Sequence, residues 1–94
     1  MRFKKGDYVK VRRWKDMENE FGLSPSGYIN TYCYFVNIMR FLCGKILYIK
    51  HVNILDYYTT LLPSGKKVMF CISDDMLEPR TYSKEEFENQ RRIK

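Results

Sequence analysis

Residues 3–14 read FKKGDYVKVRRW, and the pattern of this segment indicates the type of fold most clearly. Gly6–Asp7 is a typical turn pair. After it, Val9 and Val11 alternate with polar or aromatic residues. Alternation with a period of two is the pattern of a strand that buries one face and exposes the other. We therefore predict a strand whose valines point into a core and which ends or bulges at Arg13, where the alternation breaks.

Length and composition bound the possible folds. The chain has 94 residues, of which 45% are hydrophobic and 16% aromatic. This is one small domain with enough apolar side chains for a core, so intrinsic disorder is excluded. A TIM barrel or a complete dinucleotide-binding domain needs a longer chain.

The segment after the first strand mixes helix and loop signals. Residues 15–21 place Met17 and Phe21 four apart, as on one face of a short helix that Gly22 ends. Residues 23–27 have the composition of a loop. Aromatic and β-branched content predicts a short strand at 28–35, and helical spacing of apolar residues predicts a short helix at 36–43.

The second half has the pattern of strands joined by tight turns. Residues 45–52, 54–62 and 67–72 are rich in β-branched and aromatic side chains. The sequence PSGK at 63–66 is a tight turn, so residues 54–72 are expected to form an antiparallel hairpin. A single helical turn follows at 73–78, where Ser73 or Asp74 is expected to act as its cap and Pro79 prevents its extension.

The C-terminal stretch has the signals of a short helix. Ser83 and Glu86 have the spacing of a capping box. Acidic residues lead and basic residues trail, which complements the helix dipole. We therefore divide the chain into a β domain at 1–80 and a helical tail at 81–94.

These elements together predict a mainly β fold with short helices. The form F-x-x-G-D-x-V-x-V at residues 3–11 resembles the first strand of SH3-like barrels such as KOW and Tudor domains. The resemblance implies a small antiparallel β-barrel of about five strands, which leaves few exposed strand edges. A short internal helix and a C-terminal helix complete the expected architecture.

A second resemblance covers residues 3–79. The blocks GDYVKVRRWKDMENEFG, MRFLCGK and ISDDMLEP, at these intervals, are similar to a group of small uncharacterised proteins from Firmicutes and their phages. Those proteins tend to carry an aromatic residue before the Asp-Asp pair, where this chain has Ile72 or the nearby Phe70. The resemblance implies a shared fold and an origin in a mobile element, and it supplies no catalytic residue.

The basic residues concentrate at the N-terminus. The net charge is +6, and residues 1–15 hold seven bases and one acid. Cations that alternate with aromatic rings suit a single strand of nucleic acid, or an acidic protein surface, while the alternative is a solvated strand face that protects a sheet edge. The residues proposed for this surface are Lys4, Lys5, Tyr8, Lys10, Arg12, Arg13, Trp14 and Lys15.

A second candidate surface is the tyrosine group at Tyr28, Tyr32 and Tyr34. Tyrosine is enriched at protein interfaces. On a strand, the even spacings would place all three rings on one face. That face is either part of the core or an exposed patch for a protein partner.

No catalytic or metal-binding signature stands out. Asp74, Asp75 and Glu78 are neighbours on a turn, so turn capping is favoured over metal binding or acid–base chemistry. His51 has no nucleophile at a fixed spacing. Three scattered cysteines do not form a zinc motif, and Cys43 and Cys71 are expected to be buried as small apolar side chains. We therefore expect no enzyme activity, no cofactor and no metal.

The expected location is the cytoplasm of a bacterial host cell. The odd number of cysteines favours a reducing compartment. Residues 1–11 have no apolar signal segment, and no apolar run is long enough to span a membrane.

Two functions follow from these surfaces. The favoured one is protein–protein interaction, in which the chain acts on a host or phage protein or nucleoprotein complex; an inhibitor of a host defence nuclease is one example. The alternative is binding of nucleic acid by the basic N-terminal strand.

Overall fold

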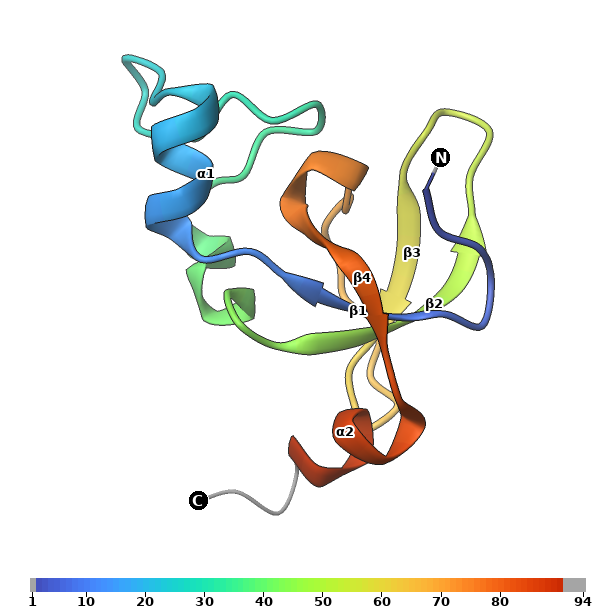
Figure 1. Ribbon diagram of the computed structural model, residues 1–94. Helices are drawn as coiled ribbons and strands as arrows, with labels where there is room; N and C mark the ends of the chain where they lie inside the picture. Colours follow the sequence, from blue (N-terminus) through green and yellow to red (C-terminus); the bar gives the residue numbers. More distant parts are fainter. Residues whose placement is uncertain (1, 91–94) are drawn as a thin grey trace.

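The computed structural model describes residues 2–90 and contains one four-stranded antiparallel sheet (Figure 1). The strands are β1 (Tyr8–Val11), β2 (Ile46–Val52), β3 (Tyr58–Leu61) and β4 (Leu77–Tyr82). Their order across the sheet is β3-β2-β1-β4. The prediction of a mainly β domain with short helices is confirmed.

Four short helices complete the described chain. They are α1 (Trp14–Phe21), the 3₁₀ helix η1 (Asn37–Leu42), the 3₁₀ turn η2 (Asp74–Met76) and α2 (Lys84–Asn89). Each lies where a helix or helical turn was predicted. Both halves of the α2 capping box are formed, since Ser83 Oγ accepts from the Glu86 N–H and Glu86 Oε1 accepts from the Ser83 N–H.

The first strand is confirmed, although it ends two residues before the break predicted at Arg13. Val9 and Val11 are fully buried, and the strand ends at Val11. In the register with β2, Tyr8 pairs with Tyr48. The pairing of β1 with β4 shifts between Val9 and Val11, and such irregularities bend a sheet.

The predicted hairpin forms, but its returning arm at 67–72 is not a regular strand. Leu61 and Lys67 form a bridge beside the turn, and Tyr58 and Ile72 form a second one. The Val68 N–H also donates to the Thr60 carbonyl at 2.9 Å. Between this hydrogen bond and the Tyr58–Ile72 bridge there are two residue steps on β3 but four on the returning arm. The two extra residues make the arm bulge away from the sheet.

The strand predicted at 28–35 is wrong. The chain instead forms a closed loop in which the backbone groups of Ile29 and Phe35 exchange hydrogen bonds at 2.9 and 3.1 Å. Both of these side chains are fully buried. Tyr34 has φ 57°, outside the strand region. Burial of the two apolar ends, rather than strand propensity, therefore sets this segment's conformation.

The sequence pattern also missed β4, because Pro79 lies inside it. Proline removes one ladder donor and is tolerated in edge strands. The strand order places β4 at an edge, which explains how this residue fits.

The core lies between the sheet, α1 and η1. Met17 and Leu42 bring α1 and η1 onto it, and both are fully buried. The cysteine prediction is wrong for Cys71, which is exposed, while Cys43 is half-buried. Cys71 lies on the arm that bulges away from β3, which accounts for its exposure.

The C-terminal helix contacts the sheet. Phe87 is largely buried, and its ring lies 5.0 Å from that of Tyr8. The Gln90 side chain accepts from the Ile46 N–H and donates to the Ile46 carbonyl at 2.6 and 2.8 Å. The expected division at residue 80 falls inside β4, and residues 91–94 of the expected tail lie outside the described residues. Within residues 2–90, no helix has the length and apolar character needed to cross a bilayer.

Candidate interaction surfaces

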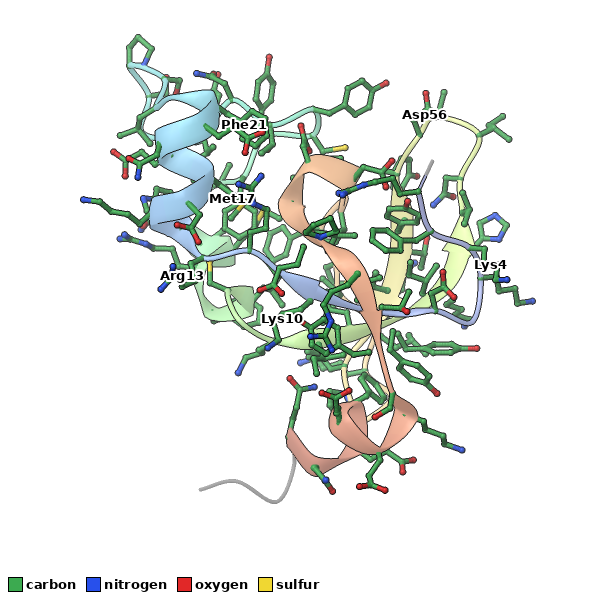
Figure 2. All side chains as sticks on the ribbon, viewed as in Figure 1. Lys4, Lys10, Arg13, Met17, Phe21 and Asp56 are labelled. Atoms are coloured by element: carbon green, nitrogen blue, oxygen red, sulfur yellow. The ribbon has the colours of Figure 1, made fainter. Side chains whose placement is uncertain are left out.

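The basic N-terminal segment does not form one surface. Figure 2 shows Lys4 and Arg13 at opposite sides of the molecule. Lys4 and Lys5 are exposed on the turn before β1, whereas Arg13 and Lys15 are exposed at the start of α1. The chain crosses the sheet between these two groups, so their charges are separated.

Arg12 and Arg13 of this segment form ion pairs with carboxylates of α1. Arg12 Nη2 lies 2.7 Å from Glu20 Oε1, and its guanidinium group lies 5.5 Å from the centre of the Phe21 ring. Arg13 Nε lies 3.1 Å from Asp16 Oδ2. Both cations are therefore partly neutralised by α1, which reduces their attraction for a phosphate.

The aromatic residues of the segment are packing groups. The Tyr8 ring lies 5.3 Å from the Tyr48 ring and is also covered by α2. Trp14 is half-buried, 5.9 Å from Phe35, and the Arg40 guanidinium group lies 4.3 Å over its ring. Lys10 Nζ lies 4.7 Å over the ring of Tyr82. The predicted alternation of cations and aromatic rings is present, but neighbouring elements pack against many of these side chains.

The tyrosine loop, defined as residues 28–35, exposes aromatic rings. Tyr32 is 64% exposed and Tyr34 is 52% exposed, while Tyr28 is half-buried. The rings of Tyr28 and Tyr34 lie 4.7 Å apart in a tilted arrangement. The expectation that all three share a strand face is wrong, because the loop turns at Tyr34.

Side chains of residues 73–78, here called the acidic turn, hold the tyrosine loop in place. Asp75 Oδ2 accepts from the Tyr32 N–H at 2.7 Å, and Asp75 Oδ1 accepts from the Ser73 hydroxyl at 2.6 Å. Ser73 Oγ in turn accepts from the Cys33 N–H at 3.4 Å. Burial, and then the neighbouring Cys71, raise the pKa of the Cys33 thiol. The loop is thus tied to a turn 40 residues away in the sequence.

The acidic turn has a structural role that differs from the predicted one. Ser73 is the N-cap residue of η2, but its side chain makes no capping bond. Asp74 accepts from the Tyr58 hydroxyl and, at 3.1 Å, from the Arg2 N–H. Burial, followed by this bond to Asp74, raises the pKa of Tyr58. The carboxylates therefore connect distant segments instead of capping their own turn.

Two hollows border the acidic turn. One, of about 380 Å³, has Tyr32 on its wall with Asp56, Ser73, Asp74 and Asp75. The other, of about 640 Å³, is lined by residues of α1, η2 and the start of β4. Its lining carries five carboxylates and two arginines: Arg2, Arg12, Asp16, Glu20, Asp74, Asp75 and Glu78. Negative charge thus dominates this side of the domain.

A third hollow has the opposite charge. It has a volume of about 570 Å³ and lies over β2 and β3. Its lining residues are Lys5, Tyr48, Lys50, His51, Thr59, Leu61 and Lys67. Of these, only Lys5 was a predicted site residue. The polar side chains near the end of the 45–52 strand were a signal for Lys50 or His51, but regular alternation would expose only one of the two. The position of Lys67 beside them depends on the hairpin.

Among residues 2–90, no three His, Cys, Asp or Glu side chains cluster as metal ligands would. The chain matches no family model, no curated protein and no solved structure in the three comparisons made. Function is therefore inferred from the surfaces described above.

Proposed function

We propose that the chain is a non-enzymatic binding module that docks a partner protein on the tyrosine loop. The observation that carries the proposal is the exposure of Tyr32 and Tyr34 on a loop held by Asp75 and Ser73. A ring held in place before binding loses little conformational entropy when a partner covers it.

The backbone at Tyr34 supports this assignment. A left-handed conformation costs a non-glycine residue about 1 kcal/mol. Tyr34 adopts it with φ 57° while leaving its ring half-exposed. Strain of this kind is concentrated at binding and catalytic sites.

Charge indicates the chemistry of the partner. Asp56, Asp74 and Asp75 share a hollow with Tyr32. Carboxylates repel the phosphates of nucleic acid and attract arginine or lysine. An arginine can also stack on the exposed tyrosine ring. The partner surface is therefore proposed to present a basic side chain.

The proposal includes an SH3-like barrel as the fold. The strand order and the 3₁₀ turn directly before β4 support it. The returning arm at 67–72 would supply the remaining side of the barrel through its bridges to Leu61 and Tyr58.

The sequence resemblance to small proteins of Firmicutes and their phages supports a host protein as the partner. A defence nuclease in the bacterial cytoplasm is the proposed example. Such an enzyme holds nucleic acid with basic side chains, which are the groups that the acidic hollow would attract. The N-terminal strand has weaker support as a nucleic-acid site, because Arg12 and Arg13 are paired with carboxylates.

The test is affinity capture from nuclease-treated bacterial lysate, followed by binding measurements with the purified captured protein. The bait is the wild-type chain or the double variant Tyr32→Ala/Tyr34→Ala. Ile38→Ala is the matched control, because Ile38 is 68% exposed on η1 and lies outside the tyrosine loop.

The expected result is a partner that survives nuclease treatment and binds the wild type and the Ile38 control equally. The double variant should bind at least about tenfold more weakly, as expected for loss of interface tyrosines. Equal binding by the tyrosine variant overturns the proposal, as does capture that disappears after nuclease treatment.

A further inference from the structure

We infer that the hollow over β2 and β3 is a second binding site, and that its ligand is a single strand of nucleic acid. This basic groove is defined by Lys5, Tyr48, Lys50, His51, Thr59, Leu61 and Lys67. It is separate from the tyrosine loop and does not depend on the protein partner proposed there.

An irregularity in the sheet creates the groove. The register of β2 with β3 shifts between Ile49 and His51. As a result, Lys50 and His51 are both exposed although they are adjacent in the strand. A regular strand would turn one of them toward the core. The bulge therefore places two nitrogen-bearing side chains side by side on the outer surface.

Two other segments complete the basic lining. The turn that carries Lys5 is tied to β2, since the Gly6 N–H donates to the Ile49 carbonyl and the Ile49 N–H donates to the Asp7 carbonyl, both at 2.9 Å. Lys67 is fixed by its bridge to Leu61. Three lysines from three separate segments thus border one hollow.

The lining of the groove holds basic side chains and no acidic one, unlike the two hollows beside the acidic turn. In the part of the chain that the structure describes, the ion pairs are those of Arg12 and Arg13, so none involves a groove lysine. An anion that enters the groove therefore meets cations whose charge no carboxylate of the lining offsets.

The side chains of the groove favour a single strand over other anions. Tyr48 is half-buried in the lining, with its ring 5.3 Å from that of Tyr8, and Thr59 offers a hydroxyl. Proteins that bind single strands combine a basic groove with aromatic rings for stacking of unpaired bases. The bases of a duplex are not free to stack on such a ring. Three lysines match a short run of successive phosphates.

The test is fluorescence anisotropy of the complete chain with a short labelled oligothymidylate, titrated at several salt concentrations. Contact with three phosphates predicts a slope of log K against log [salt] of about −2. The variant Lys50→Glu/Lys67→Glu should bind at least about tenfold more weakly. The matched control is Lys45→Glu/Lys84→Glu, which changes the net charge equally at exposed positions outside the groove and should bind within about twofold of the wild type at the same salt concentration.

Three outcomes would overturn the inference. They are an absence of binding at low salt, an equal loss of affinity in the control variant, and tighter binding of a duplex or of polyglutamate than of the single strand. Tyr48→Ala should weaken binding about fivefold or more if the ring stacks on a base. Circular dichroism on every variant separates loss of binding from loss of folding. The Tyr32→Ala/Tyr34→Ala variant should keep its affinity for the oligonucleotide, so this site and the protein-binding site are tested independently.

Discussion

The tyrosine loop and the basic groove are held in place by different kinds of bond. The loop is closed by backbone hydrogen bonds between Ile29 and Phe35, but its tip is tied to a distant turn by two side-chain acceptors, Asp75 and Ser73. The groove lies on paired strands whose backbone groups bond to one another. A single substitution can therefore release the loop locally, whereas the groove is lost only when the sheet unfolds.

The two regions also differ in how their charges are used. The carboxylates beside the loop accept hydrogen bonds from backbone and side-chain donors, so they serve the fold as well as a partner. The lysines of the groove are not needed for the fold in this way. Charge changes should therefore alter stability near the loop and alter ligand affinity in the groove.

The largest effect is expected from the sheet itself. Leu47 is fully buried in β2, where it pairs with Val9 of β1, so Leu47→Ala should lower the free energy of unfolding by about 3 kcal/mol. Urea unfolding followed by circular dichroism measures this change. Leu55→Ala is the control, because Leu55 is 68% exposed and its truncation should have little effect. If Leu47→Ala removed structure at the groove alone and left the rest of the domain folded, the groove would not depend on the whole sheet.

A smaller and local effect is expected at the acidic turn. Asp75→Ala removes the acceptor of the Tyr32 N–H and of the Ser73 hydroxyl, which should cost about 2 kcal/mol. Hydrogen exchange should speed up at the amides of Tyr32 and Cys33 more than in β1 and β2. The exposed Glu88 offers a control, since Glu88→Ala removes the same charge. Uniform acceleration across the sheet would show that the loop is not an independent unit.

The hydrogen bond that joins Tyr58 of β3 to Asp74 of the acidic turn should stabilise the fold in a pH-dependent way. The raised pKa of Tyr58 means that the folded chain keeps this proton to a higher pH than the unfolded chain does. Its contribution is complete below the ordinary tyrosine pKa of about 10, and it falls as the pH rises above that value. Stability at alkaline pH should therefore fall more in the wild type than in Tyr58→Phe.

Tyr58→Phe should also cost about 1.5 kcal/mol at neutral pH. The lost hydroxyl donates to Asp74 and accepts from the Phe3 N–H at 3.0 Å. Tyr57→Phe is the control in the same unfolding experiment. If both variants share the alkaline profile of the wild type, Tyr58 is not the titrating group.

The smallest effect is expected at α2, which packs on the sheet beside Tyr8. Ser83→Ala breaks the capping box and should cost about 1 kcal/mol. Thermal unfolding measures the loss, and Ser64→Ala in the 63–66 turn is the control. Oligonucleotide binding should be unchanged, because α2 does not line the basic groove.

The sequence predicted the elements that local chemistry specifies. Alternating valines identified β1, and the Ser83–Glu86 spacing identified the start of α2. It failed where long-range packing overrides local preference. Because of Pro79, the sequence did not predict β4, which tolerates proline at its edge position. Aromatic content predicted a strand at 28–35, but the buried Ile29 and Phe35 close a loop there.

For the candidate sites, the side chains that are available can be read from the sequence: a basic first segment, three tyrosines near Gly27 and an acidic turn after Ile72. Which of them lie together follows from the folded chain. It paired Arg12 with Glu20, joined the tyrosine loop to Asp75, and gathered Lys5, Lys50 and Lys67 around one groove. The physical reason is that side-chain proximity depends on strand register and loop closure, and both are set by burial of residues far apart in the chain.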